Sequence, residues 1–252
     1  TMHFHAEAQI VRELGKFLKN GGIYKGHRPV LWSVIEKTAL ADAEVEYHDH
    51  KSTTIYACFP ISKTDNDKFK EHSIVIWTTT PWTIPGNRAL AVHNDIEYKS
   101  LNLKINDGNK NVIIASDLVE SFIKENKIEE YKVNFSIKGH ELTNTFCKHT
   151  LYDSGYNFEV PILHGDFVTT EQGTGIVHIC PVHGMDDFIL GKQHDLELPM
   201  TINESGIYYD HIPVFNGQHI FKVDQNVCDE IKKNNNLISV SYTHLTLPTT
   251  YE

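Results

Sequence analysis

Apolar residues recur at helical spacing in three parts of the chain. The first is residues 5–20, where Gly21-Gly22 ends the pattern. Its apolar positions share one face and are Ile10, Val11, Leu14, Phe17 and Leu18. The spacing therefore predicts an amphipathic helix over 5–20, and similar patterns predict helices over 185–194 and roughly 224–233.

Short runs of β-branched and aromatic residues dominate the middle of the chain, separated by polar or glycine-containing turns. One helix is expected to interrupt them after Asp117, which forms a capping-box pattern with Glu120. Closely spaced short strands with few helices are typical of a barrel or sandwich, so we expect a mainly β fold with some helix. The expected strands cover residues 54–61, 73–79, 88–92, 97–103, 111–115, 131–137 and 176–180.

Composition indicates a folded domain, with 40% hydrophobic and 22% charged residues among 252. No apolar run is long enough to span a membrane and no signal peptide is visible, so a cytoplasmic protein is expected. The formal net charge of −10 argues against binding through many phosphates, but it allows a site for the end of a nucleic acid.

Cysteine and histidine spacing favours neither a disulfide framework nor a metal site. The four cysteines are far apart and contain no C-x-x-C pair. The pairs His3/His5 and His48/His50 lack a nearby third ligand, so we read them as surface histidines and expect no metal.

Residues 77–87, Trp-Thr-Thr-Thr-Pro-Trp-Thr-Ile-Pro-Gly-Asn, follow an apolar run directly. Three successive threonines place hydroxyls along the end of a strand, and Pro81 and Pro85 stiffen the turn that follows. A polar ligand site and a purely structural corner explain this stretch about equally well.

A second polar constellation covers residues 173–188. Here His178 lies near a strand end, and Asp186 and Asp187 fall in the first turn of the following helix, where the helix dipole favours carboxylates. Asp186 is expected to cap the helix, while an ionised Asp187 is able to bind an ammonium group.

Together the two stretches resemble the editing insertion of the class I aminoacyl-tRNA synthetases that handle isoleucine, valine and leucine. The chain is most similar to the isoleucyl members, and the resemblance covers about residues 1–237. That similarity rests on Tyr24-Lys25-Gly26 with 29–33, on 38–47, and on Phe215-Asn216-Gly217 with Phe221-Lys222. Cys180 and Val182 stand where the family more often has Ala and a small or polar residue, respectively, which affects the expected pocket volume.

The resemblance implies a closed β-barrel-like editing domain over 52–222, flanked by remnants of an α/β Rossmann catalytic domain. Residues 1–51 are expected to be a catalytic-domain segment and connection, and 223–240 a helix returning toward that domain. Residues 241–252 fit no pattern, resemble translated adapter sequence, and are expected to be a non-native tail. Because the His-Ile-Gly-His and Lys-Met-Ser-Lys-Ser motifs are absent, we expect a fragment that does not aminoacylate. ATP and Mg would serve the parent enzyme's catalytic site, and editing itself would need no cofactor.

The function implied is hydrolysis of valine esterified to the terminal adenosine at the 3′ acceptor end of tRNA(Ile). Such editing is needed because one missing methylene is worth only about 1–3 kcal/mol of discrimination. The resemblance assigns the α-ammonium of the amino acid to Asp187. It assigns contacts with adenosine, substrate and water to Thr79 and Thr80, and the pocket wall or ribose to His178.

Thr78 and Asn87 complete the implied set as substrate-binding residues. Neither motif pairs a serine or cysteine with a base, so a positioned water is expected rather than a covalent intermediate. Trp77 and Trp82 are assigned to packing in preference to stacking on adenine. Two alternatives stay open, namely a non-catalytic module that binds the acceptor end and the editing domain of a valyl-type relative. A monomer without membrane contact is expected.

Overall fold

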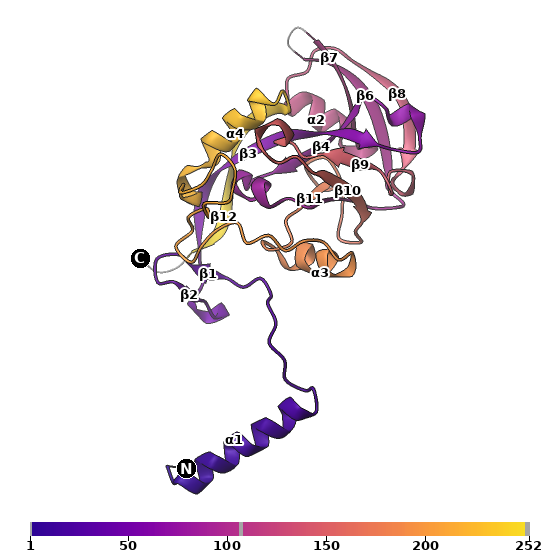
Figure 1. Ribbon diagram of the computed structural model, residues 1–252. Coiled ribbons are helices and arrows are strands. Elements are labelled where there is room, and N and C mark those ends of the chain that lie inside the picture. Colours follow the sequence, from indigo (N-terminus) through magenta and orange to yellow (C-terminus); the bar gives the residue numbers. More distant parts are fainter. Residues whose placement is uncertain (1, 106–107, 250–252) are drawn as a thin grey trace.

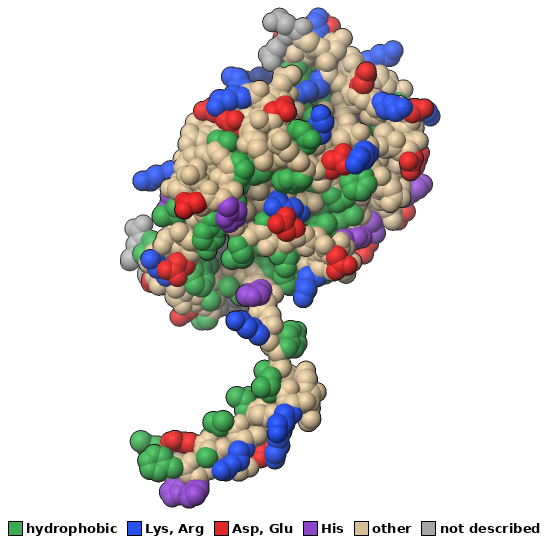
Figure 2. Space-filling model, viewed as in Figure 1, with side chains coloured by type: hydrophobic (Ala, Val, Ile, Leu, Met, Phe, Trp, Pro, Cys, Tyr) green, Lys and Arg blue, Asp and Glu red, His purple; other side chains and the backbone are tan. Residues whose placement is uncertain are grey.

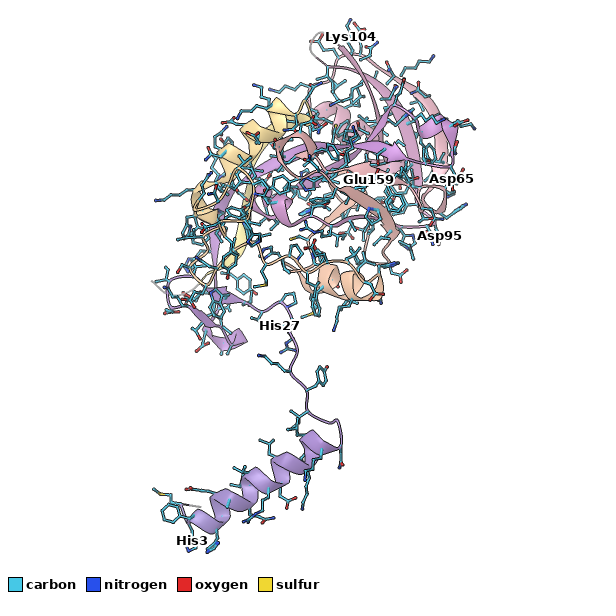
Figure 3. The ribbon with its side chains drawn as sticks, viewed as in Figure 1. His3, His27, Asp65, Asp95, Lys104 and Glu159 are labelled. Atoms are coloured by element: carbon cyan, nitrogen blue, oxygen red, sulfur yellow. The ribbon has the colours of Figure 1, made fainter. Side chains whose placement is uncertain are left out.

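The computed structural model describes residues 2–105 and 108–249, most of which form a β-rich body with few helices (Figure 1). Helix α1 (Phe4–Lys19) stands away from this body, and no residue of α1 is buried. Figure 3 shows His27 on the extended stretch that joins α1 to the body. The prediction of a mainly β fold with some helix is confirmed.

One sheet organises the body. Within the described residues the strand order is β11-β5-β10-β9-β3-β4-β7-β6-β8, and β12 pairs with β3 beside this path. A separate two-stranded ribbon joins β1 (Trp32–Ser33) to β2 (Thr38–Ala39). The strands of the large sheet are β3 (Glu46–Lys63), β4 (His72–Thr78), β5 (Ala89–Val92), β6 (Glu97–Ile105), β7 (Gly108–Ala115), β8 (Tyr131–Lys138), β9 (Phe146–Lys148), β10 (Glu159–His164), β11 (Val177–Ile179) and β12 (Leu237–Thr249).

The sheet curls so that the segment before β11 returns to the end of β7. The backbone N–H of Ala115 donates to the Thr174 carbonyl (2.9 Å), and the Tyr98 hydroxyl donates to the Gly175 carbonyl (2.9 Å). Gly175 has φ of +68°, and a Cβ there would lie 2.5 Å from the Ala115 Cβ, so only glycine allows this approach. The strand pairing itself is open between β11 and β8, so the pairing of the described strands does not close the expected barrel, and these loop contacts link the two parts of the sheet instead.

Alternate residues of β3 and β4 enter two different cores, as the period of a strand requires. Ile55, Ala57 and Phe59 lie in the larger cluster, whereas Tyr56 and Cys58 lie in a second one that includes Phe122 of α2 (Val119–Glu125). Helix α4 (Asp224–Lys233) also packs against the larger cluster. Its contributing residues are Val227, Cys228 and Ile231.

The helices predicted over 5–20, 185–194 and 224–233 are present as α1, α3 (Met185–Gln193) and α4. All seven predicted strands are present, although β3 begins eight residues before residue 54. The capping roles predicted for Asp117 and Asp186 are wrong. No side chain caps α2 or α3, since the N-cap positions are Leu118 and Gly184.

Within the large sheet, strands β9, β10 and β12 were not predicted. Pro161 obscures β10, because proline is unusual inside a sheet. Residues 241–249, which were left out of the expected fold, belong to β12 and lengthen the pairing with β3. The division between residues 51 and 52 falls within β3, and the division between 222 and 223 precedes α4. The domain assignments and the non-native origin of residues 241–252 stay predictions.

Candidate functional site

A cavity of about 630 Å³ lies where β4, β11 and α3 meet. Its size is within the range of small-molecule sites. The short 3₁₀ helix η3 (Pro81–Gly86) forms one side. The described residues that line the cavity are Pro29, Val30, Leu31, Trp77, Thr78, Thr79, Thr80, Trp82, Thr83, Val177, His178, Val182, His183, Gly184 and Met185.

The threonines stand where β4 ends. Thr78 is the last residue of β4 and is buried, and Pro81 begins η3 after Thr80, which is the N-cap. The Thr78 hydroxyl accepts the Thr80 backbone N–H (3.1 Å). The hydroxyls of Thr79 and Thr80 make no hydrogen bond with any described residue, although both side chains line the cavity. Two hydroxyls are therefore free to bind a ligand or water.

His178 is buried between Thr83 and Asn87. Its Nε2 lies 2.9 Å from the Thr83 hydroxyl oxygen, and its Nδ1 lies 3.1 Å from Asn87 Nδ2. Burial lowers the pKa of His178 to about 4, with a smaller contribution from His183. The imidazole is consequently neutral at physiological pH, and both of its nitrogens are already hydrogen-bonded.

Asp187 lies in the first turn of α3, next to the cavity rather than in its wall. Its Oδ2 accepts the Cys180 backbone N–H (2.8 Å). Gly184 lines the cavity, and a Cβ on Gly184 would lie 3.2 Å from the Asp187 Cγ, so the carboxylate packs directly behind this residue. Burial raises the pKa of Asp187 to about 6, and Asp186 adds to the rise, while the Cys180 N–H opposes it. Asp187 is mainly ionised at neutral pH and is therefore able to attract a cation.

His183 and Trp82 form the opposite corner. Their rings meet edge to face with centroids 4.8 Å apart, and His183 Nε2 lies 3.1 Å from the Thr201 hydroxyl. Burial lowers the pKa of His183 to about 4, so this ring is also neutral. Trp77 packs over Gly173, where a Cβ would lie 3.1–3.3 Å from Trp77 atoms. Both tryptophans thus pack against the protein while part of each faces the cavity.

Of the residues predicted for the site, Thr78, Thr79, Thr80 and His178 line the cavity. The structure also brings Asn87 to His178 and Asp187 to the cavity edge. The roles assigned to these residues stay predictions. Val182 lines the cavity as expected of a residue that affects pocket volume.

Several site residues were missed from the sequence. Thr83 and His183 lie inside the two motifs, so a signal was present, whereas nothing local connects residues 29–31 with the cavity. Cys180 lies behind the cavity, with its Sγ against Gly86, and burial raises its pKa to about 12. The Cys180 thiol is therefore inert and does not line the pocket.

Neither metal binding nor a membrane span is indicated by the described part of the chain. No three His, Cys, Asp or Glu side chains there are arranged to hold a metal ion. No helix of the described residues has the length and apolar character needed to cross a bilayer.

Among solved structures, the fold is similar to the one described as "The crystal structure of GlLeuRS-CP1", with a TM-score of 0.57 and 16% identity. The match covers 75% of this chain and 98% of the other. The fold is therefore that of a β-rich domain of the kind seen in that structure.

The family model for tRNA synthetases class I (I, L, M and V) matches residues 1–244. The isoleucine–tRNA ligase of Pelagibacter ubique is 49% identical over 242 residues, which cover 95% of this chain and 27% of that protein. The isoleucine–tRNA ligase of Gluconobacter oxydans is 47% identical over 239 residues, covering 91% and 25%. This chain belongs to the class I tRNA synthetase family, and it spans about a quarter of the length of these relatives.

Proposed function

We propose that the chain carries the editing site of an isoleucine–tRNA ligase and hydrolyses valine esterified to the terminal adenosine of tRNA(Ile). The observation that carries the proposal is the cavity itself, which is lined by two threonines with unbonded hydroxyls and by Gly184, behind which the partly buried Asp187 carboxylate packs. An aminoacyl ester offers an ammonium group for the carboxylate and ribose hydroxyls for the threonines.

The proposed chemistry is attack by a positioned water on the ester carbonyl. The bond between the carbonyl carbon and the ribose oxygen then breaks, the ribose oxygen takes up the proton that the water loses, and free valine leaves. Asp187 binds the α-ammonium, and Thr79 and Thr80 hold the substrate and orient the water. A covalent route lacks an activated nucleophile, because no base is hydrogen-bonded to the Thr79 or Thr80 hydroxyl and the Cys180 thiol is protonated and packed behind Gly86. His178 borders the amino acid or ribose, and Asn87 supports His178. Positioning then supplies much of the rate.

The cavity would also set specificity by size. Valine enters the site and the larger isoleucine does not, so this second site adds discrimination that a single apolar pocket cannot supply. ATP and Mg are proposed to serve the ligation site of the whole ligase, and the hydrolytic site uses no cofactor. The protein is proposed to act on tRNA as a monomer in the cytoplasm.

The direct test is deacylation of valyl-tRNA(Ile) by the purified chain, compared with its Asp187→Ala and Thr80→Ala variants. We expect at least a tenfold loss for Thr80→Ala and a larger one for Asp187→Ala, because charge-assisted hydrogen bonds are the stronger ones. None of the three proteins should deacylate isoleucyl-tRNA(Ile).

Asp186→Ala is the matched control, since Asp186 lies on the same helical turn and is exposed. It should deacylate at the parent rate. The full-length Pelagibacter ubique ligase serves as a positive control for the substrate. If Asp187→Ala hydrolyses valyl-tRNA(Ile) as fast as the parent chain, the ammonium-anchor role is wrong.

Two further measurements separate the alternatives. A non-hydrolysable valyl-adenosine analogue that binds without any turnover of the ester would indicate a binding module. Preferential deacylation of threonyl-tRNA(Val) would indicate a valyl-type relative.

A further inference from the structure

The backbone of Thr79 and Thr80 is held by hydroxyl groups from neighbouring residues. The Ser52 hydroxyl on β3 donates to the Thr79 carbonyl, and the Thr83 hydroxyl donates to the Thr80 carbonyl (2.8 Å). The Thr83 backbone N–H also donates to the Thr80 carbonyl (3.1 Å). Ser52 and Thr83 are each only 7% exposed. These bonds fix the backbone and leave the Thr79 and Thr80 side chains unbonded.

The direction of each hydrogen bond around His178 follows from counting hydrogens. Thr83 has one hydroxyl hydrogen, and the Thr80 carbonyl can only accept, so His178 Nε2–H must donate to Thr83. Asn87 Nδ2 has two hydrogens, one for the Ala89 carbonyl (2.9 Å) and one for His178 Nδ1. Both ends of the network therefore select the same neutral tautomer, with the proton on Nε2.

We propose that Ser52 and Thr83 are positioning residues for the editing reaction, and that His178 is a neutral brace between Thr83 and Asn87 rather than an acid or base. This inference rests on the proposed function. The chain of donors runs from Asn87 through His178 and Thr83 to the Thr80 carbonyl. It ends at the residue whose free hydroxyl faces the cavity.

The arrangement explains why so many hydroxyl groups gather behind two residues. Without the Thr83 hydroxyl, the Thr80 carbonyl keeps only the Thr83 backbone N–H as a donor, so the Thr80 backbone is held less firmly and its side chain shifts with it. Displacing a reacting group by about 1 Å is able to cost roughly 100-fold in rate. The effect should fall on kcat, because Ser52 lies behind the cavity and Thr83 acts through Thr80.

The first test compares two substitutions at one position. Thr83→Val keeps the shape and removes the hydroxyl, whereas Thr83→Ser keeps the hydroxyl. Deacylation of valyl-tRNA(Ile) should show kcat reduced about 10- to 100-fold in Thr83→Val with KM changed less than about threefold, and Thr83→Ser should stay within about threefold of the parent. Equal losses in both variants would overturn the proposal.

Ser52→Ala has a matched control in Ser121→Ala, because the Ser121 hydroxyl also donates to a backbone carbonyl, that of Leu118 (3.0 Å), but on α2. Ser52→Ala should lower kcat about tenfold and Ser121→Ala should not change it. A parent-like kcat in Ser52→Ala would remove Ser52 from the proposed set.

The second test is nitrogen NMR of His178 in the unmodified chain, which requires neither activity nor a folded variant. We expect a neutral ring with the proton on Nε2 throughout pH 5–8. A ring that titrates between pH 6 and 7, or one protonated on Nδ1, would overturn this role of His178. If the chain fails to deacylate valyl-tRNA(Ile) while the NMR result is as expected, the proposed function is wrong, but the hydrogen-bonding role of the neutral His178 between Thr83 and Asn87 is supported.

Discussion

At the residue scale, the ionised carboxylate of Asp187 lowers the stability of the folded protein. The start of α3 and the Cys180 N–H both favour the ionised carboxylate, yet burial outweighs them and raises its pKa to about 6. No described cation forms an ion pair with Asp187. A partly buried carboxylate whose only described partners are backbone N–H groups is therefore suited to receive an external ammonium group.

Replacement of Asp187 by asparagine should stabilise the free protein. A carboxyl group whose pKa is raised in the folded state stabilises folding below its unfolded pKa of about 3.9 and loses that contribution as pH rises through about 6. At pH 7.5 Asp187→Asn should raise the free energy of unfolding in urea by about 1–2 kcal/mol while abolishing deacylation.

The exposed neighbour provides the comparison, since Asp186→Asn should change the free energy of unfolding by less than about 0.5 kcal/mol. If Asp187→Asn is destabilised at pH 7.5, the carboxylate is supported by contacts beyond the Cys180 N–H, and the argument from burial is wrong.

At the scale of elements, the stiff turn predicted from Pro81 and Pro85 is the 3₁₀ helix η3. Three segments from other parts of the chain donate hydrogen bonds to its backbone carbonyls or pack against its end. The His149 Nε2–H donates to the Ile84 carbonyl (3.1 Å), and the Tyr208 hydroxyl donates to the Trp82 carbonyl. Gly86 closes against Cys180, where a Cβ would lie 2.5 Å from the Sγ.

Gly86→Ala should destabilise the protein by about 1–3 kcal/mol, because the added methyl overlaps the Cys180 sulfur. Cys180→Ala removes that sulfur, so the double variant should recover a large part of the loss. A cycle of four urea unfolding curves would measure a coupling of about 1 kcal/mol or more. Additive effects of the two substitutions would show that the methyl is accommodated elsewhere.

Local sequence identified the elements that carry their own pattern. Strand β4 is an apolar run that ends at successive threonines, and α4 has its apolar residues on one face. Strand β10 could not be found in this way, because its pairing with β5 joins residues about seventy positions apart and it contains Pro161. Non-local pairing leaves little trace in a short window.

The same limit applies to the site. Thr79, Thr80 and Asp187 were predicted because the two motifs resemble those of a family, and Thr83 lies in the first of these motifs. Ser52 has no local signal, since its role depends on the pairing of β3 with β4, which places it beside Thr79. Likewise, only the folded chain shows that residues 29–31 line the cavity.

At the scale of the whole molecule, the apolar stripe predicted for residues 5–20 is on the surface. Figure 2 shows hydrophobic side chains in a row along α1, and Phe4, Ile10 and Phe17 are each more than half exposed. The β-rich body buries its own apolar residues without α1. The body, rather than the leading helix, therefore determines the stability of the fold.

Three histidines of that body pack around η3, and all three are neutral: His149 and His178 are buried, and His183 is partly buried. Burial lowers the pKa of His149 to about 3 and the pKa values of His178 and His183 to about 4. Each one-unit shift corresponds to about 1.4 kcal/mol. A histidine whose pKa is depressed on folding stabilises the protein above its unfolded pKa of about 6.5, and this contribution is lost as pH falls toward 4.

The free energy of unfolding should consequently fall steeply between pH 6.5 and 4, because three histidines outweigh the opposite contribution of Asp187. Urea midpoints measured at half-unit pH intervals would show the fall.

His149→Gln is able to keep a donor toward the Ile84 carbonyl but removes one titrating group. Its free energy of unfolding should therefore fall less steeply with pH over this range, whatever its stability at pH 7.5. Equal slopes for the parent chain and His149→Gln would mean that His149 is able to take up its proton without leaving the native state, and that the region under η3 opens locally before the molecule unfolds.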